Sequence, residues 1–413
     1  MQHANEKIYS EITTCRLCFS DDLQDVLDLG SQPPANNLRA NLSELEQVAP
    51  LKLVHCGKCS VVQLTTTLEP AYLFSQYVWV TGTSATARGY SEVYCKEVLS
   101  RSKIQAPFVL EIASNDGTFL RKFKERGCEI LGVDPAKNIA IKASNTGIPT
   151  FAEFFDVTIV KKILTEHRKP DIVMARNVIP HVKDIHSIVE GMSEIVNDEG
   201  IVVIEFHYAK TIVEELHYDS VYHEHLFYFS IQSLSTLFVR YGLHPFDVFA
   251  SPISGGSLVL FFSKRKKDQT IALRGLIEVE QKSSLNELSA WQQFGAKSRQ
   301  HADNLKDIVK KYSNSRELIA YGASARSSTL MNFVGISSDE IGYVIDRSPL
   351  KHNLYTPGTN IHIVSYEEGI KRLGNNDILL LAWNFEEEIV KDLRAIGFDG
   401  DIIVPLPNEV HIR

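Results

Sequence analysis

Hydrophobic and polar positions alternate in the middle of the chain as they do in a strand, a tight turn, a helix and a second strand. Phe108–Leu110 is a short apolar run, which suits a strand buried on both faces. A polar turn over residues 111–117 follows it. A helix with its apolar residues on one face comes next, and Gly127 is well placed to end it. Ile130–Val133 then predicts the second strand, so this stretch is a βαβ unit.

The same alternation continues as far as residue 262. Apolar runs predict three more parallel strands and, after a helix over Ile231–Gly242, a final pair of strands. These predicted strands are Ile148–Phe154, Asp171–Ala175, Gly200–Glu205, His244–Phe249 and Ser257–Phe262. The final pair, joined by Gly255 and Gly256, is a hairpin that a plain dinucleotide-binding fold lacks.

The polar turn indicates which ligand the βαβ unit would bind. A dinucleotide site needs Gly-x-Gly-x-x-Gly, whereas Glu-Ile-Ala-Ser-Asn-Asp-Gly has one glycine and two carboxylates, which would repel a diphosphate and favour a cation. The turn resembles motif I of class I S-adenosylmethionine (SAM) dependent methyltransferases. The resemblance implies that Glu111 and the loop hold the methionine part and that Asp134 binds the ribose hydroxyls. The implied cofactor-binding residues are Glu111, Ala113, Ser114, Asn115, Asp116, Gly117, Asp134, Pro135 and Asn177. The alternative is an α/β unit with a solvated acidic loop.

Four of the six cysteines form two Cys-x-x-Cys pairs near the N-terminus. Each pair can grip one metal ion from a knuckle-like turn, and four thiolates complete a tetrahedral site with no open position. The sequence therefore predicts a structural zinc ion, with a redox or catalytic metal as the alternative. The expected ligands are Cys15, Cys18, Cys56 and Cys59. Cys95 and Cys128 have no partner at a useful spacing and are expected to pack in the core.

Composition excludes several classes of protein. The chain has 413 residues, 44% of them hydrophobic and 23% charged, which describes a globular protein of two or three domains. A net charge of −8 and the lack of a basic stripe argue against nucleic acid. Without an apolar leader or a run of 18 apolar residues, we expect a cytoplasmic protein that does not enter a membrane.

Polar clusters follow two of the predicted strands, where catalytic residues of such folds lie. They span Arg176–Val182 and Tyr222–Phe229, and hold three histidines, Glu224 and two tyrosines. Each histidine alone could be an ordinary core or surface residue. Together they offer a base and hydroxyl groups, as needed to remove a proton from carbon and stabilise an enolate. An aromatic run, Tyr72–Trp79, could line the same cleft or belong to the core.

The paired cysteines, the Glu-Ile-Ala-Ser-Asn-Asp-Gly loop and Tyr-His-Glu-His-Leu-Phe-Tyr-Phe-Ser together resemble the nucleotide-sugar 3-C-methyltransferases. The resemblance covers nearly the whole chain. It implies methyl transfer from SAM to C3 of a nucleoside-diphosphate-linked 4-keto-6-deoxy sugar through an enolate. It also implies that His225 is the base, that Glu224 orients or polarises it, and that Tyr222 and His181 line the sugar pocket. Tyr77 would support the enolate oxygen.

A second βαβ unit begins near residue 317, after a largely helical connector over 276–313. Its first turn is small, hydroxyl-bearing and cationic, which suits a diphosphate at a helix N-terminus. In the resembled family this part binds the sugar nucleotide; it could instead only cap the cleft. The expected substrate-binding residues are Tyr321, Gly322, Ser324 and Arg326. Family members often have Lys-Gly where Arg326-Ser327 stands here, so the contact with phosphate is left open.

These observations predict an α/β protein of three parts: a zinc-binding domain (1–80), a Rossmann-like methyltransferase domain (81–265), and a connector with a second Rossmann-like domain (266–413). Two other functions stay open: an O- or N-methyltransferase acting on a nucleotide sugar, and a scaffold that binds SAM and a nucleotide without turnover. Because no exposed heptad pattern occurs, we expect a monomer or a weak oligomer.

Overall fold

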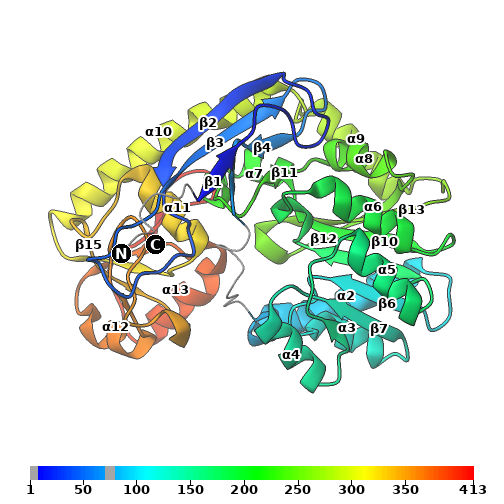
Figure 1. Cartoon of the computed structure of the whole chain (residues 1–413). Coiled ribbons are helices and arrows are strands. Elements are labelled where there is room, and N and C mark those ends of the chain that lie inside the picture. Colours follow the sequence, from blue (N-terminus) through cyan, green and yellow to red (C-terminus); the bar gives the residue numbers. More distant parts are fainter. Residues whose placement is uncertain (1–7, 70–79) are drawn as a thin grey trace.

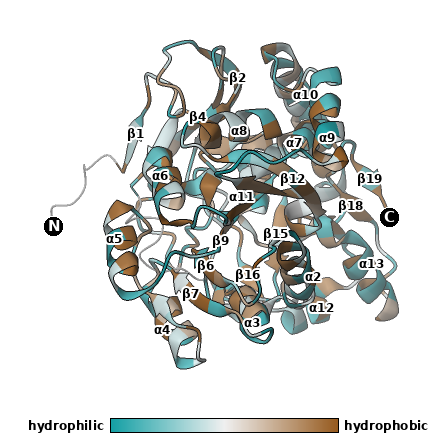
Figure 2. Ribbon diagram, turned by 90° about the vertical axis from the view of Figure 1, so that its right-hand side faces the viewer, coloured by the Kyte–Doolittle hydropathy of each residue, from teal (hydrophilic) through white to brown (hydrophobic). Residues whose placement is uncertain are grey.

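The computed structural model describes residues 8–69 and 80–413. Its helices and strands form three parts, which Figure 1 shows as a C-terminal part on the left and a middle part on the right, with the N-terminal sheet and the long helix α10 above them. Apolar strands lie in the interior, where Figure 2 shows brown strands among helices with teal outer faces. The prediction of an α/β fold with Rossmann-like sheets is confirmed.

The N-terminal sheet has the strand order β11-β4-β3-β2, and a separate pair joins β1 to β5. The N-terminal strands are β1 (Tyr9–Glu11), β2 (Leu23–Gln32), β3 (Ala49–Cys56), β4 (Val62–Leu64) and β5 (Thr66–Leu68). Residues 64–68 have a strand-like sequence, Leu-Thr-Thr-Thr-Leu. The structure breaks this run at Thr65, so that β4 pairs with β3 while β5 pairs with β1.

The middle sheet has the strand order β12-β13-β10-β9-β6-β7-β8 among the described residues. Neighbours from β8 to β10 are parallel, whereas β13 runs antiparallel to both β10 and β12. The predicted final hairpin is therefore present, with its second strand inserted beside β10. Its strands are β6 (Phe108–Ile112), β7 (Glu129–Val133), β8 (Thr150–Phe151), β9 (Ile172–Arg176), β10 (Ile201–His207), β12 (His244–Ser251) and β13 (Ser257–Ser263).

Helices accompany this sheet, and short 3-10 turns lie at several strand ends. The helices are α2 (Ala85–Arg101), α3 (Thr118–Lys124), α4 (Lys137–Asn145), α5 (Val157–Glu166), α6 (Ile185–Ile195), α7 (Ala209–Glu214) and α8 (Ile231–Val239). The 3-10 turns are η1 (Thr81–Thr83), η2 (Ile179–His181), η3 (Tyr218–Ser220) and η4 (Ile253–Gly255). Helix α8 begins with a capping box between Ser230 and Ser233, which satisfies backbone donors that a helix start leaves open.

The C-terminal sheet has the strand order β16-β15-β14-β17-β18-β19, parallel except for β19. Its strands are β14 (Leu318–Tyr321), β15 (Ile341–Ile345), β16 (Ile363–Val364), β17 (Asp377–Leu380), β18 (Ile402–Val404) and β19 (His411–Ile412). The helices and 3-10 turns are α9 (Ile271–Lys282), α10 (Leu288–Ser313), α11 (Ala325–Val334), η5 (Pro349–Lys351), α12 (Tyr366–Leu373), η6 (Trp383–Phe385) and α13 (Glu386–Ala395).

The three parts interlock through two elements that cross between them. Strand β11 (Phe227–Tyr228) lies within the middle part of the sequence, yet it pairs antiparallel with β4 of the N-terminal sheet. Helix α10 packs against β2, at a point where a Cβ on Gly295 would lie 2.3 Å from the backbone oxygen of Val26. The stretch expected to be a connector thus also covers the N-terminal sheet.

Candidate active site and zinc centre

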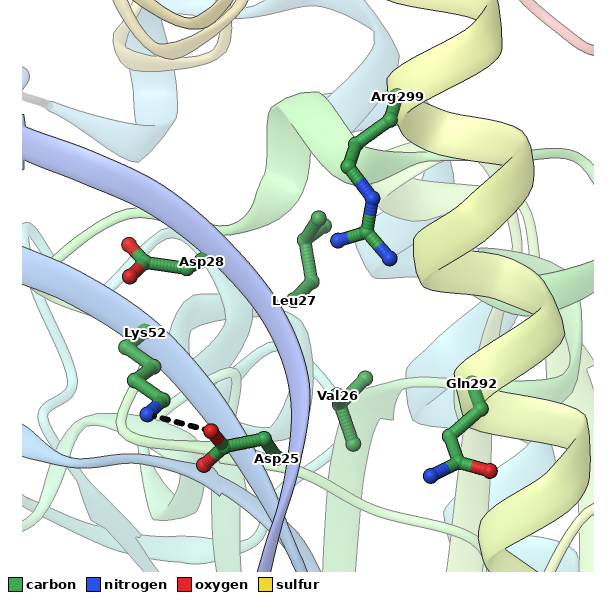
Figure 3. A pocket seen from close by; sticks show the side chains of 7 residues that line it. All are labelled: Asp25, Val26, Leu27, Asp28, Lys52, Gln292 and Arg299. Atoms are coloured by element: carbon green, nitrogen blue, oxygen red, sulfur yellow. Dashed lines mark ion pairs between the residues drawn. The ribbon is translucent and has the colours of Figure 1, made fainter.

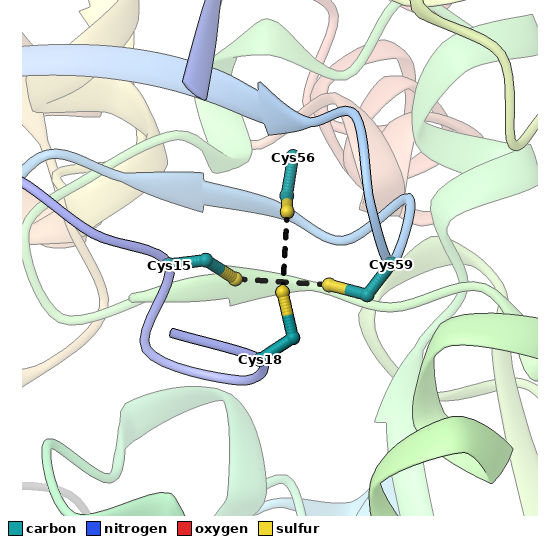
Figure 4. A group of neighbouring side chains, drawn as sticks. All are labelled: Cys15, Cys18, Cys56 and Cys59. Atoms are coloured by element: carbon teal, nitrogen blue, oxygen red, sulfur yellow. Dashed lines mark hydrogen bonds between the residues drawn. The ribbon is translucent and has the colours of Figure 1, made fainter. Parts of the chain in front are cut away.

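The four paired cysteines converge at the start of the N-terminal sheet, as Figure 4 shows. Their Sγ atoms all lie within 4.8 Å of one another, with Cys15 3.7 Å from Cys59 and Cys18 3.5 Å from Cys56. A tetrahedral zinc ion with Zn–S bonds of about 2.3 Å needs sulfur atoms about 3.8 Å apart, so the cluster fits zinc. Gln63 Nε2 donates to Cys15 Sγ at 3.0 Å, which helps to orient that ligand. The predicted four-cysteine zinc site is confirmed.

The acidic turn predicted to bind SAM lies where β6 ends and α3 begins. Its backbone is left-handed at Ala113, Asn115 and Gly117, with φ of 52°, 51° and 74°. Gly117 is required by space as well as by φ, because a Cβ there would lie 2.7 Å from the side chain of Ile148. The left-handed shape of the loop therefore depends on a glycine at position 117 and on the packing around it.

Asp134, at the end of β7, is tied to this turn by its carboxylate. It accepts hydrogen bonds from the backbone N–H of Asn115 at 2.8 Å and of Ala136 at 2.9 Å. Burial raises the pKa of Asp134. The next residue, Pro135, is half-buried. Acidic groups from the ends of two adjacent parallel strands thus meet at one crevice.

Glu111 is fully buried on β6 and faces Arg176 on β9. Arg176 Nε donates to Glu111 Oε1 at 2.9 Å, and its Nη1 lies 3.5 Å from Glu205 on β10. Burial, partly offset by Arg176, raises the pKa of Glu111 to about 7. Glu111 Oε2 and the buried hydroxyl of Ser114 both lack a hydrogen-bond partner among the described residues. A carboxylate oxygen and a hydroxyl left open at this crevice fit an ammonium-bearing cofactor.

The remaining predicted cofactor residues have partners within the protein. Asp116 accepts from the backbone of Gly82 at 3.1 Å and from the hydroxyl of Thr118 at 2.7 Å. Asn177 follows β9 with φ of 52°, and its N–H donates to Glu205 O at 2.8 Å. Asn177 therefore lies at the end of β9, the strand next to β6. Its predicted role is to contact the cofactor.

His225 lies between two hydrogen-bond partners that fix its neutral form. Its Nδ1 is 2.9 Å from Ser220 O, and a carbonyl only accepts, so Nδ1 carries the proton. Its Nε2 is then the lone-pair nitrogen, and the Tyr222 hydroxyl donates to it at 2.9 Å. Burial, and the like charges of His181, His207 and Arg326, lower the pKa of His225 well below its ordinary value. The imidazole is thus held ready to accept a proton at Nε2.

Glu224 was predicted to orient or polarise His225, but the ring nitrogens of His225 contact Tyr222 and Ser220 rather than Glu224. Its Oε1 accepts a hydrogen bond of 2.6 Å from Asn36 Nδ2, from the N-terminal part. Burial raises the pKa of Glu224. The Ser220 carbonyl orients the imidazole instead, as the Nδ1 contact shows.

The other two histidines of the predicted cluster differ in their surroundings. The ring of His181, on η2, lies 4.8 Å from the ring of His225, and burial lowers its pKa to about 4. His223 points away, with Nε2 3.1 Å from Ala49 O and 3.2 Å from Pro50 O on β3. The structure therefore brings together His181, Tyr222 and His225, while His223 fastens the motif to the N-terminal sheet. Tyr77 lies outside the described residues.

The turn predicted to bind the diphosphate is engaged within the protein. Arg326, at the start of α11, forms two hydrogen bonds with the buried Asp219 of η3, at 3.0 and 2.8 Å, and lies over the Trp383 ring at 4.6 Å. Trp383 Nε1 also donates to Asp219 at 2.8 Å. Ser324 caps α11 in a capping box with Ser327.

Gly322 and Tyr321 are constrained by their neighbours in the C-terminal sheet. A Cβ on Gly322, whose φ is 102°, would lie 2.6 Å from the Cβ of Ala382. The Tyr321 hydroxyl accepts a hydrogen bond of 3.1 Å from Arg347. Both residues are thus fixed in place at the end of β14, just before the start of α11.

Asn36, Asp219 and Trp383 were not identified from the sequence. Asp219 lies only three residues before Tyr222, so the polar character of that stretch was a usable signal. Nothing in the local pattern marks Asn36, which follows two prolines in a loop, or Trp383, which follows an apolar strand.

An open groove of about 390 Å³ lies elsewhere, between β2, β3 and α10. Figure 3 shows it lined by acidic, basic and apolar side chains, with Lys52 paired to Asp25 at 2.8 Å. None of the predicted site residues lines it. Within residues 8–69 and 80–413, no helix is both long and apolar enough to cross a membrane.

Comparison with known proteins places the whole chain. The PH0226 protein from Pyrococcus horikoshii OT3 aligns with a TM-score of 0.37, 14% identity, and coverage of 45% of this chain and 95% of that one. Magnesium protoporphyrin IX methyltransferase from Synechocystis PCC 6803 aligns with a TM-score of 0.34 and 8% identity, over 43% and 79% of the two chains. The C-methyltransferase NovU of Streptomyces niveus is 29% identical over 409 residues, 97% of each chain.

Three family models match successive parts of the sequence. They describe a zinc binding domain over residues 15–74, a methyltransferase domain over 87–246 and a C-methyltransferase C-terminal domain over 252–407. The first contains the four-cysteine cluster, and the second contains the acidic crevice and the His225 motif. The chain is thus similar along nearly its whole length to C-methyltransferases, with a zinc binding domain, a methyltransferase domain and a C-methyltransferase C-terminal domain in succession.

Proposed function

We propose that the chain transfers the methyl group of SAM to C3 of a nucleoside-diphosphate-linked 4-keto-6-deoxy sugar through an enolate. The observation that carries this proposal is the Tyr222–His225 pair, in which Nδ1 is tied to a carbonyl and Nε2 is an acceptor. A neutral imidazole with a defined lone pair is suited to take a proton from carbon, and a phenol beside it can stabilise an oxyanion. Methylation of oxygen or nitrogen would not need groups that remove a proton from carbon and stabilise an enolate.

The proposed reaction moves one proton and one methyl group. His225 Nε2 takes the proton from C3, which the C4 ketone acidifies. The Tyr222 hydroxyl, which donates to Nε2 in this structure, turns to donate to the C4 oxygen as the enolate forms. His181 would line the sugar pocket beside His225, and Tyr77 would support the enolate oxygen. SAM supplies an electrophilic methyl group, which C3 of the enolate attacks as the bond to sulfur breaks.

Glu111, Ser114 and the loop through Gly117 are the proposed contacts for the methionine part of SAM. The open oxygen of Glu111 supports this assignment because it is a buried acceptor without a donor among the described residues. Asp134 would bind the ribose hydroxyls, with Ala113, Asn115, Asp116, Pro135 and Asn177 shaping the rest of the pocket.

We propose that the C-terminal domain binds the sugar nucleotide at the start of α11. A helix N-terminus and the cationic Arg326 support a diphosphate site. Asp219 offsets the charge of Arg326, so the backbone N–H groups of the first helical turn would carry much of the phosphate recognition. Gly322 and Ser324 would allow the diphosphate to approach, and Tyr321 would face the nucleoside. We also propose domain boundaries at residues 80 and 265, and the cytoplasm as the compartment, because thiolate zinc ligands suit a reducing environment.

The reaction is tested with methyl-labelled SAM and a small panel of nucleotide-linked 4-keto-6-deoxy sugars. Mass spectrometry should show a gain of one labelled methyl, and NMR should show it on carbon after mild acid cleavage of the nucleotide. A label on oxygen or nitrogen would instead support the O- or N-methyltransferase. Binding of SAM without any product would favour the scaffold.

The role of His225 is tested by its replacement with asparagine. The rate should fall by roughly 10²-fold or more, with SAM affinity within a few fold. Exchange of the C3 hydrogen for deuterium in heavy water should be lost in the same variant. His167→Asn is the control, because His167 follows α5 and contacts none of the predicted site residues. An unchanged rate in His225→Asn would remove it from the role of base.

A further inference from the structure

The loop between β2 and β3 reaches both other parts of the molecule. In Figure 1 this blue segment runs down from β2 over the C-terminal part before it returns to β3. We call residues Asn36–Glu46 the interdomain tie. Its residues are not zinc ligands, and the functions assigned above do not account for its contacts.

On the catalytic side, the tie holds the residue next to His225. Asn36 is exposed, whereas the Glu224 carboxylate that it contacts is buried. The Nδ2–Oε1 distance of 2.6 Å is that of a short hydrogen bond. Without this donor the buried carboxyl group of Glu224 would lose its hydrogen bond to Asn36, so Asn36 matters to the position of the motif.

On the other side, the tie is fastened to the loop at residues 355–360. Arg39 and Tyr355 exchange two backbone hydrogen bonds, of 2.9 and 2.8 Å. Arg39 Nη1 donates to Asn360 Oδ1 at 2.8 Å and lies 3.6 Å from Glu46. Glu46 in turn accepts from Gly358 N at 3.0 Å. The Arg39 and Glu46 side chains are only 10% and 14% exposed, so this is a largely buried contact.

The loop passes the contact on to α11, the helix that starts at the proposed diphosphate site. Asn332, on α11, donates to Pro357 O at 3.0 Å and to Ser328 O at 2.8 Å. The start of α11 is held by the ion pair between Arg326 and Asp219. Asp219 lies three residues before Tyr222 in the sequence. Helix α11 is thus fixed near its start by the middle domain and further along by the tie.

We propose that the interdomain tie sets the position of the diphosphate-binding turn relative to the catalytic motif, with Asn36, Arg39 and Glu46 as positioning residues. This inference rests on the proposed function for its catalytic consequence. Transfer needs the reacting carbon about 3–3.5 Å from its partners, and a sugar held by its diphosphate on α11 reaches His225 only when the two domains keep their spacing. A shift of about 1 Å can lower the rate 10²-fold.

The contact is tested first without any substrate, by hydrogen–deuterium exchange of the full zinc-loaded chain. Glu46→Gln removes one charge from the buried contact and keeps the side chain's shape. Glu44→Gln is the matched control, because it removes the same charge from an exposed side chain of the same segment. Glu46→Gln should speed exchange both in residues 353–361 and in the distant residues 222–228, and Glu44→Gln should change neither. Faster exchange only at 353–361 would overturn the proposal.

The catalytic consequence is tested by steady-state kinetics of Asn36→Ala and Arg39→Lys. Arg39→Lys should raise KM for the sugar nucleotide about tenfold, while Asn36→Ala should lower kcat; KM for SAM should stay within about twofold in both. Parallel changes for both substrates would show a general loss of folding and contradict a positioning role. If the parent enzyme turns over no sugar nucleotide, the proposed function fails, while the exchange experiment still decides on the tie.

Discussion

At the scale of single residues, burial decides the protonation states in the candidate site. The histidines beside the Tyr222–His225 pair are held neutral, because the interior disfavours their charged forms. Burial raises the pKa values of Glu111 and Glu224, because it disfavours the charged carboxylate as well. His225 and Glu111 should therefore give two separate pH dependences, one of catalysis and one of SAM binding.

The first concerns His225. Its pKa lies well below the ordinary value of 6.5, so the base stays unprotonated as the pH falls through that value. The acid limb of the kcat/KM profile, which reports the free enzyme, should therefore lie below pH 6.5. A half-maximal value at or above an ordinary histidine pKa would contradict this expectation.

The second concerns Glu111 and SAM. A cationic ligand favours the carboxylate, and the pKa of Glu111 is about 7 without ligand, so SAM binding should release a proton at and below neutral pH. Affinity should fall about tenfold for each pH unit below that pKa. Calorimetry in buffers of different ionisation heat measures both effects. Glu111→Gln should abolish them, and a pH-independent affinity in the parent protein would contradict the assignment.

At the scale of elements, β11 and α10 join parts that are distant in sequence. Strand β11 continues directly from the His225 motif into the N-terminal sheet, and Leu64 N donates to Leu226 O at 3.0 Å. Helix α10 lies against β2 so closely that only glycine fits at position 295. Both contacts make the position of the motif depend on the N-terminal sheet.

The close approach of α10 to β2 can be tested by Gly295→Ala. The added Cβ would meet Val26 O at 2.3 Å, so we expect a loss of about 2 kcal/mol in the free energy of unfolding. Gly275→Ala is the control, on the exposed face of α9, with nothing within 4 Å of its Cβ position. It should stabilise by about 0.5 kcal/mol. Denaturant titration measures both, and equal effects would show that the approach is not close.

At the scale of the whole molecule, the zinc centre is connected to the candidate active site through the N-terminal sheet. The cysteines hold the N-terminal sheet, which in turn carries β11 and the contacts of Asn36 and His223 to the catalytic motif. The zinc-binding domain is therefore part of the scaffold of the site.

Removal of zinc should consequently abolish turnover as well as loosen the N-terminal sheet. We expect a chelator, or Cys18→Ser, to lower the melting temperature and to speed hydrogen exchange in residues 222–228. Structural zinc contributes folding free energy directly, so the loss should be reversed by added zinc in the chelated protein. Full activity in zinc-free protein would show that the sheet keeps its shape without the metal.

The sequence by itself determined the features that depend on local spacing. Apolar runs with a 3.6-residue or strand-like pattern predicted most strands of the middle sheet and the final hairpin, and the Cys-x-x-Cys pairs predicted the metal centre, because ligand spacing and side-chain periodicity are local properties. The strand-like run at residues 64–68 marks the limit of such local patterns, since it could not show that β4 and β5 have different partners.

Tertiary structure decided which distant groups meet. Asn36 contacts Glu224 across 188 residues and Arg326 pairs with Asp219 across 107, so no local pattern could indicate either contact. The pKa shifts depend on burial, which only the packed domains produce. The contact that orients His225 comes from the carbonyl of Ser220. The sequence could not indicate it, because a backbone oxygen has no signature in sequence and becomes a partner only when the chain folds.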